Sequence, residues 1–433
     1  MKRFLFLIVE GGGNVPAQMS IARRLVARGH QVHVLADRVV EGEAVSAGCR
    51  FHTFVRAPQH NMRDRQADVV RDWEPSSPVA QIRRVGNHVM FGPSAAYARD
   101  LLDTIERVRP DALAVDCLPF GAIVGAEKSG IPAAVLVHYP FLGAVEGATP
   151  FGLGLHPARG WLGKLRDRAL FAIMRRMSRF GLAPVNAARR ELGMAPLRDV
   201  FDQFHTLSRS LVLTSREYDF APSGLPAHVR YVGPQLDDPS WAEDWIPPWP
   251  SGASLDPLVV VSLGSTYQRQ EKAFAAIVQA LGRLPVRGLA TFGTIDVPTS
   301  HVPSNVVVAR SVPHAAVLPL AAAVVCHGGH GTVMKALAHA LPLVVMPFGR
   351  DQKDNGARVE VCGAGVSLPP TAGPARIASA VRRVLEGPAF HASAQRMAAV
   401  IARDVREDRA VAEMEALAGI PGTFRAGSGE RLR

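Results

Sequence analysis

The sequence predicts an α/β protein with two domains, each built from alternating strands and helices around a parallel sheet. Short, continuous apolar runs recur along the chain, and most are followed by a segment whose apolar residues have helical spacing. The length of 433 residues is typical of two or three domains. A stretch rich in Pro, Asp and Trp, 233–256, is predicted to be the linker between a first domain, 1–232, and a second, 257–386.

The composition indicates a globular protein that suits anionic ligands. Apolar residues make up 48% of the chain and charged residues 20%. The net charge of +11 comes from arginines spread along the chain, and no motif of a nucleic-acid-binding fold is present, so we expect no nucleic-acid partner. The cysteines lie far apart, which predicts a reducing cytoplasm with neither disulfides nor structural zinc; they are Cys49, Cys117, Cys326 and Cys362.

The chain begins with a strand–helix–strand unit. The apolar run 4–9 is shorter than the apolar region of a signal peptide and is predicted to be a buried parallel strand. A loop at 11–16 leads into a helix that ends at Gly29, and the next strand is predicted at 31–35. No later stretch reaches the roughly 18 apolar residues that a membrane-spanning helix needs. We therefore expect a cytoplasmic protein.

The same unit raises a rival hypothesis. Gly11 and Gly13 follow a strand, and the acidic Asp37 comes after the next strand, as in part of the dinucleotide-binding fingerprint. Pro16 occupies the place of the third glycine. A nicotinamide-dependent oxidoreductase therefore remains an alternative, although it gives no role to the glycine-rich stretch described below.

Further apolar runs complete the first predicted sheet, at 110–116, 132–137, 211–214 and 230–232. Asp116 and His138 come at the carboxyl ends of two of these strands, the edge at which α/β proteins bind ligands.

A basic amphipathic helix is predicted at 160–180. It contains many Lys and Arg residues but a single acid, Asp167. These charged residues alternate with Trp161, Leu162 and other apolar residues. Helices on membrane surfaces have this pattern, and so do solvated helices that pack on one face. We favour the solvated helix and keep contact with a membrane surface as an alternative.

The second domain repeats the alternation of strands and helices. The predicted strands lie at 258–262, 289–292, 306–308, 323–326, 343–346 and 365–368, and the predicted helices at 273–281, at 333–340, from 351 onward and at 374–385. A long helical segment follows at 392–417, and the Gly- and Arg-rich tail 419–433 is predicted to be disordered.

A glycine-rich turn, His327–Thr332, lies between a predicted strand and a predicted helix. This arrangement aims free backbone N–H groups and the positive end of the helix dipole at an anion. Thr332 can cap the helix and donate a hydroxyl proton, and His327 can donate to a phosphate oxygen. The turn therefore predicts a phosphate site.

This stretch resembles a known family. The run HGGHGT, followed by ALAHALPLVVMP and then DQKDN, is similar to the donor-binding signature of the nucleotide-sugar-dependent glycosyltransferases of family 1, bacterial natural-product type. The resemblance implies the GT-B fold, in which two Rossmann-like domains face each other across a cleft. It also implies that the last helical segment, 387–418, crosses back onto the first domain, and that neither a metal nor another cofactor is needed.

The resemblance further implies an activity and a donor site. The activity is inverting transfer of a sugar from a UDP- or dTDP-sugar to a hydroxyl of a small apolar acceptor such as a polyketide, macrolide, aromatic compound or terpenoid. Lys335 stands where many relatives have a Glu, which leaves dTDP-sugars open. The implied donor-binding residues are Gly13, Ser265, Thr266, Ser311, Val312, His314, His327, Gly329, His330, Gly331, Thr332, Asp351 and Gln352.

The catalytic base departs from the family pattern. Relatives carry a His or Asp base in the first loop, and Asn14 occupies that place here. An amide cannot take the proton of the acceptor hydroxyl. Asp116 and His138 are the candidate replacements, although Asp116 can also serve to anchor Asn14 and His138 can be a core histidine. A third option is an acidic acceptor, such as a phenol, that needs little help.

The acceptor site is predicted from the same edge of the first domain. Its candidate residues are Asn14, His88, Phe91, His138 and Phe141, with core packing as the alternative for His88 and Phe91. Three alternatives to the glycosyltransferase remain: a sugar-nucleotide epimerase on the same fold, the oxidoreductase, and a non-catalytic nucleotide-sugar-binding partner. No metal site is predicted, because His327 and His330 lack a third ligand at suitable spacing. The protein can be a monomer or a homodimer.

Overall fold

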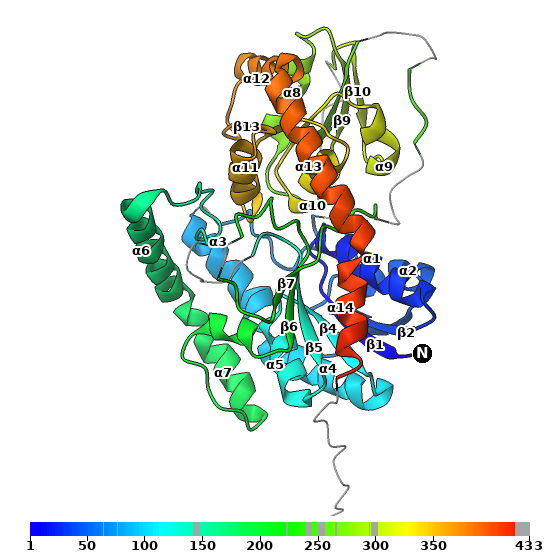
Figure 1. Ribbon diagram of the computed structural model, residues 1–433, viewed down its shortest axis with the longest axis vertical. Coiled ribbons are helices and arrows are strands. Elements are labelled where there is room, and N and C mark those ends of the chain that lie inside the picture. Colours follow the sequence, from blue (N-terminus) through cyan, green and yellow to red (C-terminus); the bar gives the residue numbers. More distant parts are fainter. Residues whose placement is uncertain are drawn as a thin grey trace, which may run out of the picture.

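A computed structural model describes most of the chain and has two parallel sheets covered by helices (Figure 1). The described residues are 1–63, 65–75, 77–141, 148–221, 224–239, 245–249, 256–264, 266–293, 295 and 302–420. Parts of the predicted linker, 240–244 and 250–255, and the predicted disordered tail from 421 onward lie outside them.

The first sheet has seven parallel strands among the described residues, in the order β3-β2-β1-β4-β5-β6-β7. The strands are β1 Arg3–Ile8, β2 Gln31–Ala36, β3 Arg50–Thr53, β4 Ala112–Asp116, β5 Ala133–Val137, β6 Arg209–Val212 and β7 Val229–Tyr231. In the middle, Leu5 of β1 pairs with His33 on one side and Leu113 on the other. Because β1, β4 and β5 are buried on both faces, their sequences are continuous apolar runs.

The helices of the first domain lie around its sheet. They are α1 Asn14–Ala27, α2 Glu41–Ser46, α3 Pro78–Val85, α4 Ser94–Val108, α5 Phe120–Ser129, α6 Gly160–Ser178 and α7 Leu182–Glu191, with short turns η1 Arg38–Val40, η2 Gly86–Met90, η3 Arg179–Gly181 and η4 Val200–His205. Side chains of α4 and α5 pack against one face, and side chains of α1 pack against the other.

The second sheet has six parallel strands among the described residues, in the order β10-β9-β8-β11-β12-β13. The strands are β8 Leu258–Ser262, β9 Arg287–Thr291, β10 Val306–Ala309, β11 Ala323–Cys326, β12 Leu343–Val345 and β13 Gly365–Ser367. The helices are α8 Glu271–Leu281, α9 His314–Val317, η5 Leu318–Leu320, α10 His330–Ala338, α11 Gln352–Val361 and α12 Pro374–Glu386. Side chains of α8 and α12 pack on one face, and those of α10 on the other. The predicted α/β class with two parallel sheets is confirmed.

The long helical segment at 392–417 is two helices rather than one. They are α13 Pro388–Glu407 and α14 Arg409–Leu417. Asp408 separates them in a left-handed conformation, with φ at 47°, which Asp tolerates better than most residues. Its carboxylate pairs with Arg24 of α1 and with Arg28, which follows that helix. α13 packs on the second domain and leads to α14, whose Val411 and Met414 lie in the core of the first domain (Figure 1).

Two helix starts also differ from the expectation. α1 begins at Asn14 rather than after Pro16, because a proline in the first turn lacks only an N–H group that would have no partner there. α10 begins at His330 rather than at Val333. In the described part of the chain, no helix combines the length and the apolar character needed to cross a membrane.

Buried polar contacts join the two domains at the carboxyl ends of both sheets. Asp219, in the segment between β6 and β7, pairs with Arg358 of α11 at 2.8 Å, and their side chains are 1% and 5% exposed. His330 at the start of α10 lies 3.3 Å from the carbonyl oxygen of Leu213, which follows β6. These contacts bring the loops after the strands of one sheet against those of the other.

Candidate active site

A glycine-rich turn links β11 to α10 and packs around His327. The Nδ1 atom of His327 lies 3.2 Å from the carbonyl oxygen of Ser262, at the end of β8. A Cβ atom added at Gly329 would lie 2.3 Å from Nε2 of His327, and one added at Gly264 would lie 2.9 Å from it. Glycine is required at both positions, because a side chain would displace the imidazole.

The imidazole of His327 is neutral in this environment. Burial lowers its pKa to about 4; the carbonyl of Ser262 acts against this shift and the Arg350 guanidinium adds to it. Nδ1 therefore carries the single proton and donates it to Ser262, so Nε2 has none. Donation from Nε2 to a phosphate oxygen, which the sequence suggested, requires a second proton on the ring.

The start of α10 faces open space. Gly329 precedes the helix, and no side chain of the described residues caps its first turn. The first N–H groups of a helix have no partner within it, and they form the positive end of its dipole. Apart from its chain neighbours and the helix backbone, no atom of the described residues lies within 4 Å of the position that a Cβ of Gly331 would take, and Thr332 is half-buried in the same turn. This end of α10 has the chemistry to hold an anion.

His330 has a different position from the other residues of the turn. Its ring is buried, with Nε2 3.3 Å from the Leu213 carbonyl and Nδ1 3.3 Å from the side-chain oxygen of Asn355. Burial lowers its pKa to about 4. The ring of His330 therefore joins the two domains. At the open start of α10, His330 offers its backbone N–H group and not its ring.

An ion pair next to the turn brings a carboxylate from the predicted linker. Lys335 of α10 donates to Asp238 at 2.5 Å, and the N–H of Ala315 donates to the other oxygen of Asp238 at 2.7 Å. Burial opposes the charged form of Asp238, but Lys335, the N–H of Ala315 and His314 together outweigh it, so the pKa of Asp238 is lowered. His314 lies close to this pair and to His327. Burial lowers the pKa of His314 to about 4, and Lys335 and His327 act in the same direction.

At the start of α11, Asp351 has free hydrogen-bond acceptors and the side-chain amide of Gln352 is engaged. Asp351 accepts one bond, from the side chain of Asn355 at 2.8 Å, and burial raises its pKa to about 6. The side-chain oxygen of Gln352 accepts the N–H groups of Phe348 and Gly349, and its amide nitrogen donates to Gln268. Gln352 thus closes the turn before α11, and Asp351 is the member of the pair with free acceptor capacity.

Arg350 is a site residue that the sequence did not indicate. It has a left-handed backbone, with φ at 55°, which is unusual for an arginine. Its guanidinium donates to Asp72 of the first domain at 2.8 Å and to the hydroxyl of Thr266 at 3.1 Å. The side chain also lowers the pKa of His327, so it lies beside the glycine-rich turn. The second carboxylate oxygen of Asp72 is buried without a partner among the described residues.

Asp116 is fully buried at the end of β4, where two side-chain amides of α1, those of Asn14 and Gln18, donate to it. One of its oxygens accepts from Asn14 at 2.8 Å and from Gln18 at 2.5 Å, and the other accepts the N–H of Leu118. Asn14 also donates to the carbonyl of Val9. Both hydrogens of the Asn14 amide are therefore used, and the oxygens of Asn14 and Gln18 are buried with no partner among the described residues. Gln18 lies four residues after Asn14, on the same helix face.

His138 follows β5 and completes a small polar cluster. Its Nδ1 atom lies 3.9 Å from Asp116 and 3.7 Å from the sulfur of Cys117, whose thiol donates to the Tyr139 hydroxyl. Burial lowers the pKa of His138, so the ring is neutral. Asp116, Cys117 and His138 lie within metal-ligand reach of one another, but both oxygens of Asp116 already accept hydrogen bonds. The cluster reaches the second domain, because His138 contributes to lowering the pKa of His330.

The other predicted acceptor residues do not gather at one place. His88 is exposed and bonds the carbonyl of Arg84. Phe91 is 3% exposed and packs between Phe120 and Phe180, with ring centroids 4.8 and 5.4 Å away. The alternative of core packing therefore describes Phe91 better. Phe141 is buried beside the domain interface, where its N–H donates to Asp219.

The remaining predicted residues take the following places. Gly13 is exposed immediately before α1, and Ser311 and Val312 lie between β10 and α9, half-buried and buried. Ser265 lies outside the described residues. Asp37, on which the oxidoreductase alternative depends, already accepts the N–H groups of Glu10 and His60. Its carboxylate is therefore engaged within the first domain.

Comparison with known proteins gives one consistent result. Residues 277–417 match the family described as Erythromycin biosynthesis protein CIII-like, C-terminal domain. The 4'-demethylrebeccamycin synthase of Lentzea aerocolonigenes is 30% identical over 409 residues, which span 91% of this chain and 94% of that protein.

Solved structures share the fold. The glycosyltransferase of kitacinnamycin superposes with a TM-score of 0.74 at 23% identity, over 96% of this chain and 98% of that one. The glycosyltransferase VinC, in complex with dTDP, has a TM-score of 0.64 at 19% identity, over 96% and 99%. These two likenesses show the fold, and the relative of Lentzea aerocolonigenes shows the family. The chain is a glycosyltransferase of family 1, with the GT-B fold and of the bacterial natural-product type.

Proposed function

We propose that the enzyme transfers a sugar, with inversion, from a dTDP- or UDP-sugar to a hydroxyl of a small apolar acceptor. The observation that carries this proposal is the start of α10, an uncapped helix end beside His327 and Arg350. A diphosphate placed there would meet backbone N–H groups, the helix dipole and a guanidinium. The complex of VinC with dTDP, a protein of the same fold, supports a nucleotide diphosphate as the ligand.

In this proposal the second domain stabilises the leaving diphosphate. Negative charge grows on the diphosphate as the glycosidic bond breaks, and preorganised donors at the helix start offset that charge. Thr266 and Thr332 supply hydroxyls in this region, and Lys335, which pairs with Asp238, stands where many relatives carry a Glu for the ribose hydroxyls. The free acceptor capacity of Asp351 suits the hydroxyls of the sugar.

Replacing Arg350 with methionine should raise the KM for the donor by about 10- to 100-fold, because a hydrogen bond to a charged group contributes about 1.5–3 kcal/mol. The maximal rate should fall less. Steady-state kinetics with the donor varied would measure both quantities. Arg109→Met is the matched control, since Arg109 is an exposed arginine of the first domain with a similar backbone, φ at 50°. An unchanged KM in Arg350→Met would remove Arg350 from the donor site.

The first domain would bind the acceptor beside Asn14, whose unpartnered oxygen is buried next to Gly11 and would meet a hydroxyl once the loop before α1 shifts. Asp116 and Val9 hold both amide hydrogens, which turns the oxygen into a fixed hydrogen-bond acceptor for an incoming hydroxyl. Asn14 orients this hydroxyl but takes no proton. Asp116 acts as a positioning residue because it is buried behind Asn14. The neutral His138 can then take the proton of the acceptor hydroxyl. An acidic hydroxyl, such as that of a phenol, can lose its proton without a protein base.

Replacing Asn14 with histidine should create a general base. One ring nitrogen can donate to Asp116 as the amide does now, and the other becomes a proton acceptor at the site of the hydroxyl. Transfer to an aliphatic alcohol should rise by about 10²–10⁴-fold over its low wild-type rate, while transfer to a phenol changes little. A pH profile of transfer to the alcohol should gain a new acidic limb, because the rate falls as the pH drops below the pKa of the new histidine, ordinarily about 6.5.

Asn14→Ala provides the comparison and should lower transfer to both kinds of acceptor. If Asn14→His neither raises the rate with the alcohol nor alters the pH profile, Asn14 does not contact the reacting hydroxyl.

The direct assay combines a dTDP- or UDP-sugar with a phenolic acceptor and follows the product by mass spectrometry and its anomeric configuration by NMR. An inverted glycoside supports the proposal. An isomerised sugar nucleotide without glycoside would indicate an epimerase, and binding without turnover for any acceptor would indicate a non-catalytic partner. The domain boundaries, the cytoplasmic location and the choice between monomer and homodimer remain predictions.

A further inference from the structure

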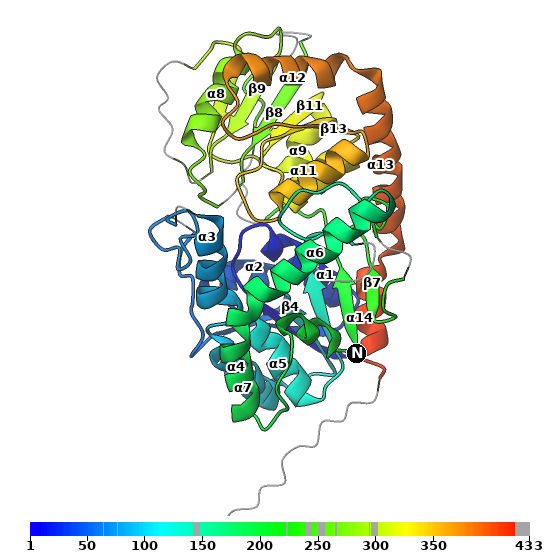
Figure 2. The ribbon, with the colours of Figure 1, turned by 90° about the vertical axis from the view of Figure 1, so that its left-hand side faces the viewer.

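Helix α6 is almost entirely exposed. Of its described residues only the side chain of Asp167 is buried, although the helix is 19 residues long. The side chains of Trp161, Leu162, Leu165 and Ile173 are between 52% and 72% exposed. Figure 1 shows α6 at the margin of the molecule, and Figure 2 shows it crossing the outer face of the first domain. A helix with so much exposed apolar surface calls for a partner.

The exposed and the half-buried apolar residues occupy different sides of α6. At about 100° per residue, the exposed side chains of Trp161, Leu162, Leu165, Ile173 and Met177 fall within an arc of roughly 160°. The half-buried side chains fall on the opposite side, together with Asp167; they are Leu170, Phe171 and Met174. The fold therefore uses one apolar side of α6 and leaves the other uncovered.

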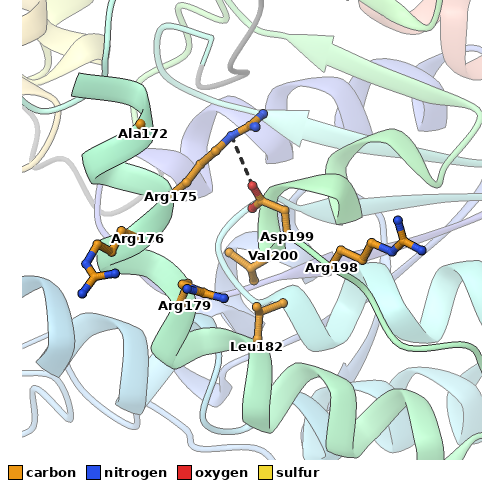
Figure 3. A pocket seen from close by; sticks show the side chains of 8 residues that line it. All are labelled: Ala172, Arg175, Arg176, Arg179, Leu182, Arg198, Asp199 and Val200. Carbon is orange, nitrogen blue, oxygen red and sulfur yellow. Dashed lines mark ion pairs between the residues drawn. The ribbon is translucent and has the colours of Figure 1, made fainter. Parts of the chain in front are cut away.

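Basic side chains lie on and beside the uncovered side: at about 100° per residue Arg166 and Arg176 fall within its arc, and Lys164, Arg168 and Arg175 lie next to its edge at Trp161. α6 carries five Lys and Arg residues against the single acid Asp167, which pairs with Arg166 at 2.8 Å. At its carboxyl end a pocket of about 250 Å³ is lined by arginines and one acid (Figure 3). The charged lining residues are Arg175, Arg176, Arg179, Arg198 and Asp199, with Arg175 and Asp199 forming an ion pair at 3.2 Å. The pocket keeps an excess of positive charge suited to phosphate groups.

We propose that α6 docks the enzyme on an anionic lipid surface. Trp161, Leu165 and their apolar neighbours would enter the interfacial layer, and the arginines of the pocket would pair with lipid phosphates. A second copy of the chain is a poor partner, because two identical faces of this helix would bring like charges together. The segment before α6 is bonded to the second domain, where Asp354 accepts the N–H groups of Gly152 and Gly154. The docked surface thus adjoins the domain interface that holds the proposed acceptor site.

Flotation of the full-length protein with lipid vesicles tests the proposal. The enzyme should float with vesicles of mixed phosphatidylcholine and phosphatidylglycerol at low salt, much less at high salt, and not with phosphatidylcholine alone. Lys164→Glu with Arg176→Glu should weaken binding by about 25-fold or more, since each basic residue near an anionic surface contributes roughly fivefold. Trp161→Ala with Leu165→Ala should also weaken it.

Matched controls carry the same changes elsewhere. Arg376→Glu with Arg382→Glu alters two exposed arginines of α12, in the second domain, and Ile246→Ala removes an exposed apolar side chain. These controls should float like the wild type. Circular dichroism and transfer to a soluble acceptor should be unchanged in every variant, so a loss of flotation cannot be a loss of folding or of the proposed activity.

Four results would overturn the proposal. The first is no flotation with anionic vesicles, and the second is equal flotation with phosphatidylcholine alone. The third is loss of binding in the charge variant with full binding in the Trp161 and Leu165 variant, which would indicate a polyanion or an acidic protein instead of lipid. The fourth is a dimer in light scattering that the α6 variants dissociate, which would make this face an interface between copies of the chain.

Discussion

Replacing Arg358 with leucine should lower the free energy of unfolding by about 3–5 kcal/mol, the cost of leaving a buried charge without its partner. Arg358 is the buried cation that pairs with Asp219 across the domain interface, at 2.8 Å. Asp219 would keep the N–H of Phe141 and the hydroxyl of Tyr231 but lose its counter-charge. Urea denaturation followed by circular dichroism would measure the loss.

The loss should depend on pH. Burial raises the pKa of Asp219 and Arg358 lowers it, so removing Arg358 raises this pKa further. A protonated Asp219 carries no charge that needs a partner. The deficit of Arg358→Leu should therefore be largest at neutral pH and shrink as the pH falls through the raised pKa.

Two controls separate the buried pair from the general effect of losing an arginine. Arg99→Ala breaks the pair of Arg99 with Glu191, in which the side chains are 53% and 45% exposed, and should cost at most about 1 kcal/mol. Asp219→Asn added to Arg358→Leu should recover part of the stability. If Arg358→Leu and Arg99→Ala cost the same, the buried pair is not what holds the domains together.

Replacing His327 with alanine should lower kcat by about 10²–10³-fold, the usual cost of removing one donor that stabilises charge in the transition state. In the free enzyme Nδ1 donates to Ser262 and Nε2 carries no proton. A diphosphate beside the ring favours the doubly protonated form and raises the pKa of His327 from about 4. Rate measurements at saturating donor and acceptor would give the change.

This mechanism also predicts uptake of a proton when the nucleotide binds. Because the pKa of His327 is higher in the complex than in the free enzyme, its contribution to affinity should weaken as the pH rises through the bound-state pKa. Calorimetric titration in buffers of different ionisation enthalpy would count the proton. His339→Ala is the control, since His339 is exposed at the other end of α10 and should alter neither kcat nor proton uptake. Proton uptake that persists in His327→Ala would assign the proton to another group.

The sequence predicted the parts of the molecule that depend on neighbouring residues. Buried parallel strands are continuous apolar runs, so β1, β4 and β5 were evident from composition alone. The proposed anion site after β11 could be predicted for the same reason, because its glycines, His327 and Thr332 lie close together in the chain. The place of Asn14 in the first loop likewise led to the prediction that the usual base of the family is absent, which stays a prediction.

The parts that were missed depend on residues far apart in the chain. Arg350 meets Asp72 and Lys335 meets Asp238 only when the fold brings separate segments together. Sequence spacing also could not show that the side-chain oxygen of Gln352 closes a turn, or that Phe91 lies in the core. The break at Asp408 was missed because helical spacing continues through it, and contacts with Arg24 and Arg28 stabilise the left-handed residue.

The measurement that tests the central claim most directly is the thermal unfolding midpoint of the wild type and of His327→Ala with dTDP, UDP or NAD, each in excess. A ligand at about 100 times its dissociation constant stabilises the folded protein by roughly 2.7 kcal/mol, which raises the midpoint by a few degrees. We predict a shift with dTDP or UDP that His327→Ala removes or greatly reduces. A shift with NAD alone would contradict the proposed donor site.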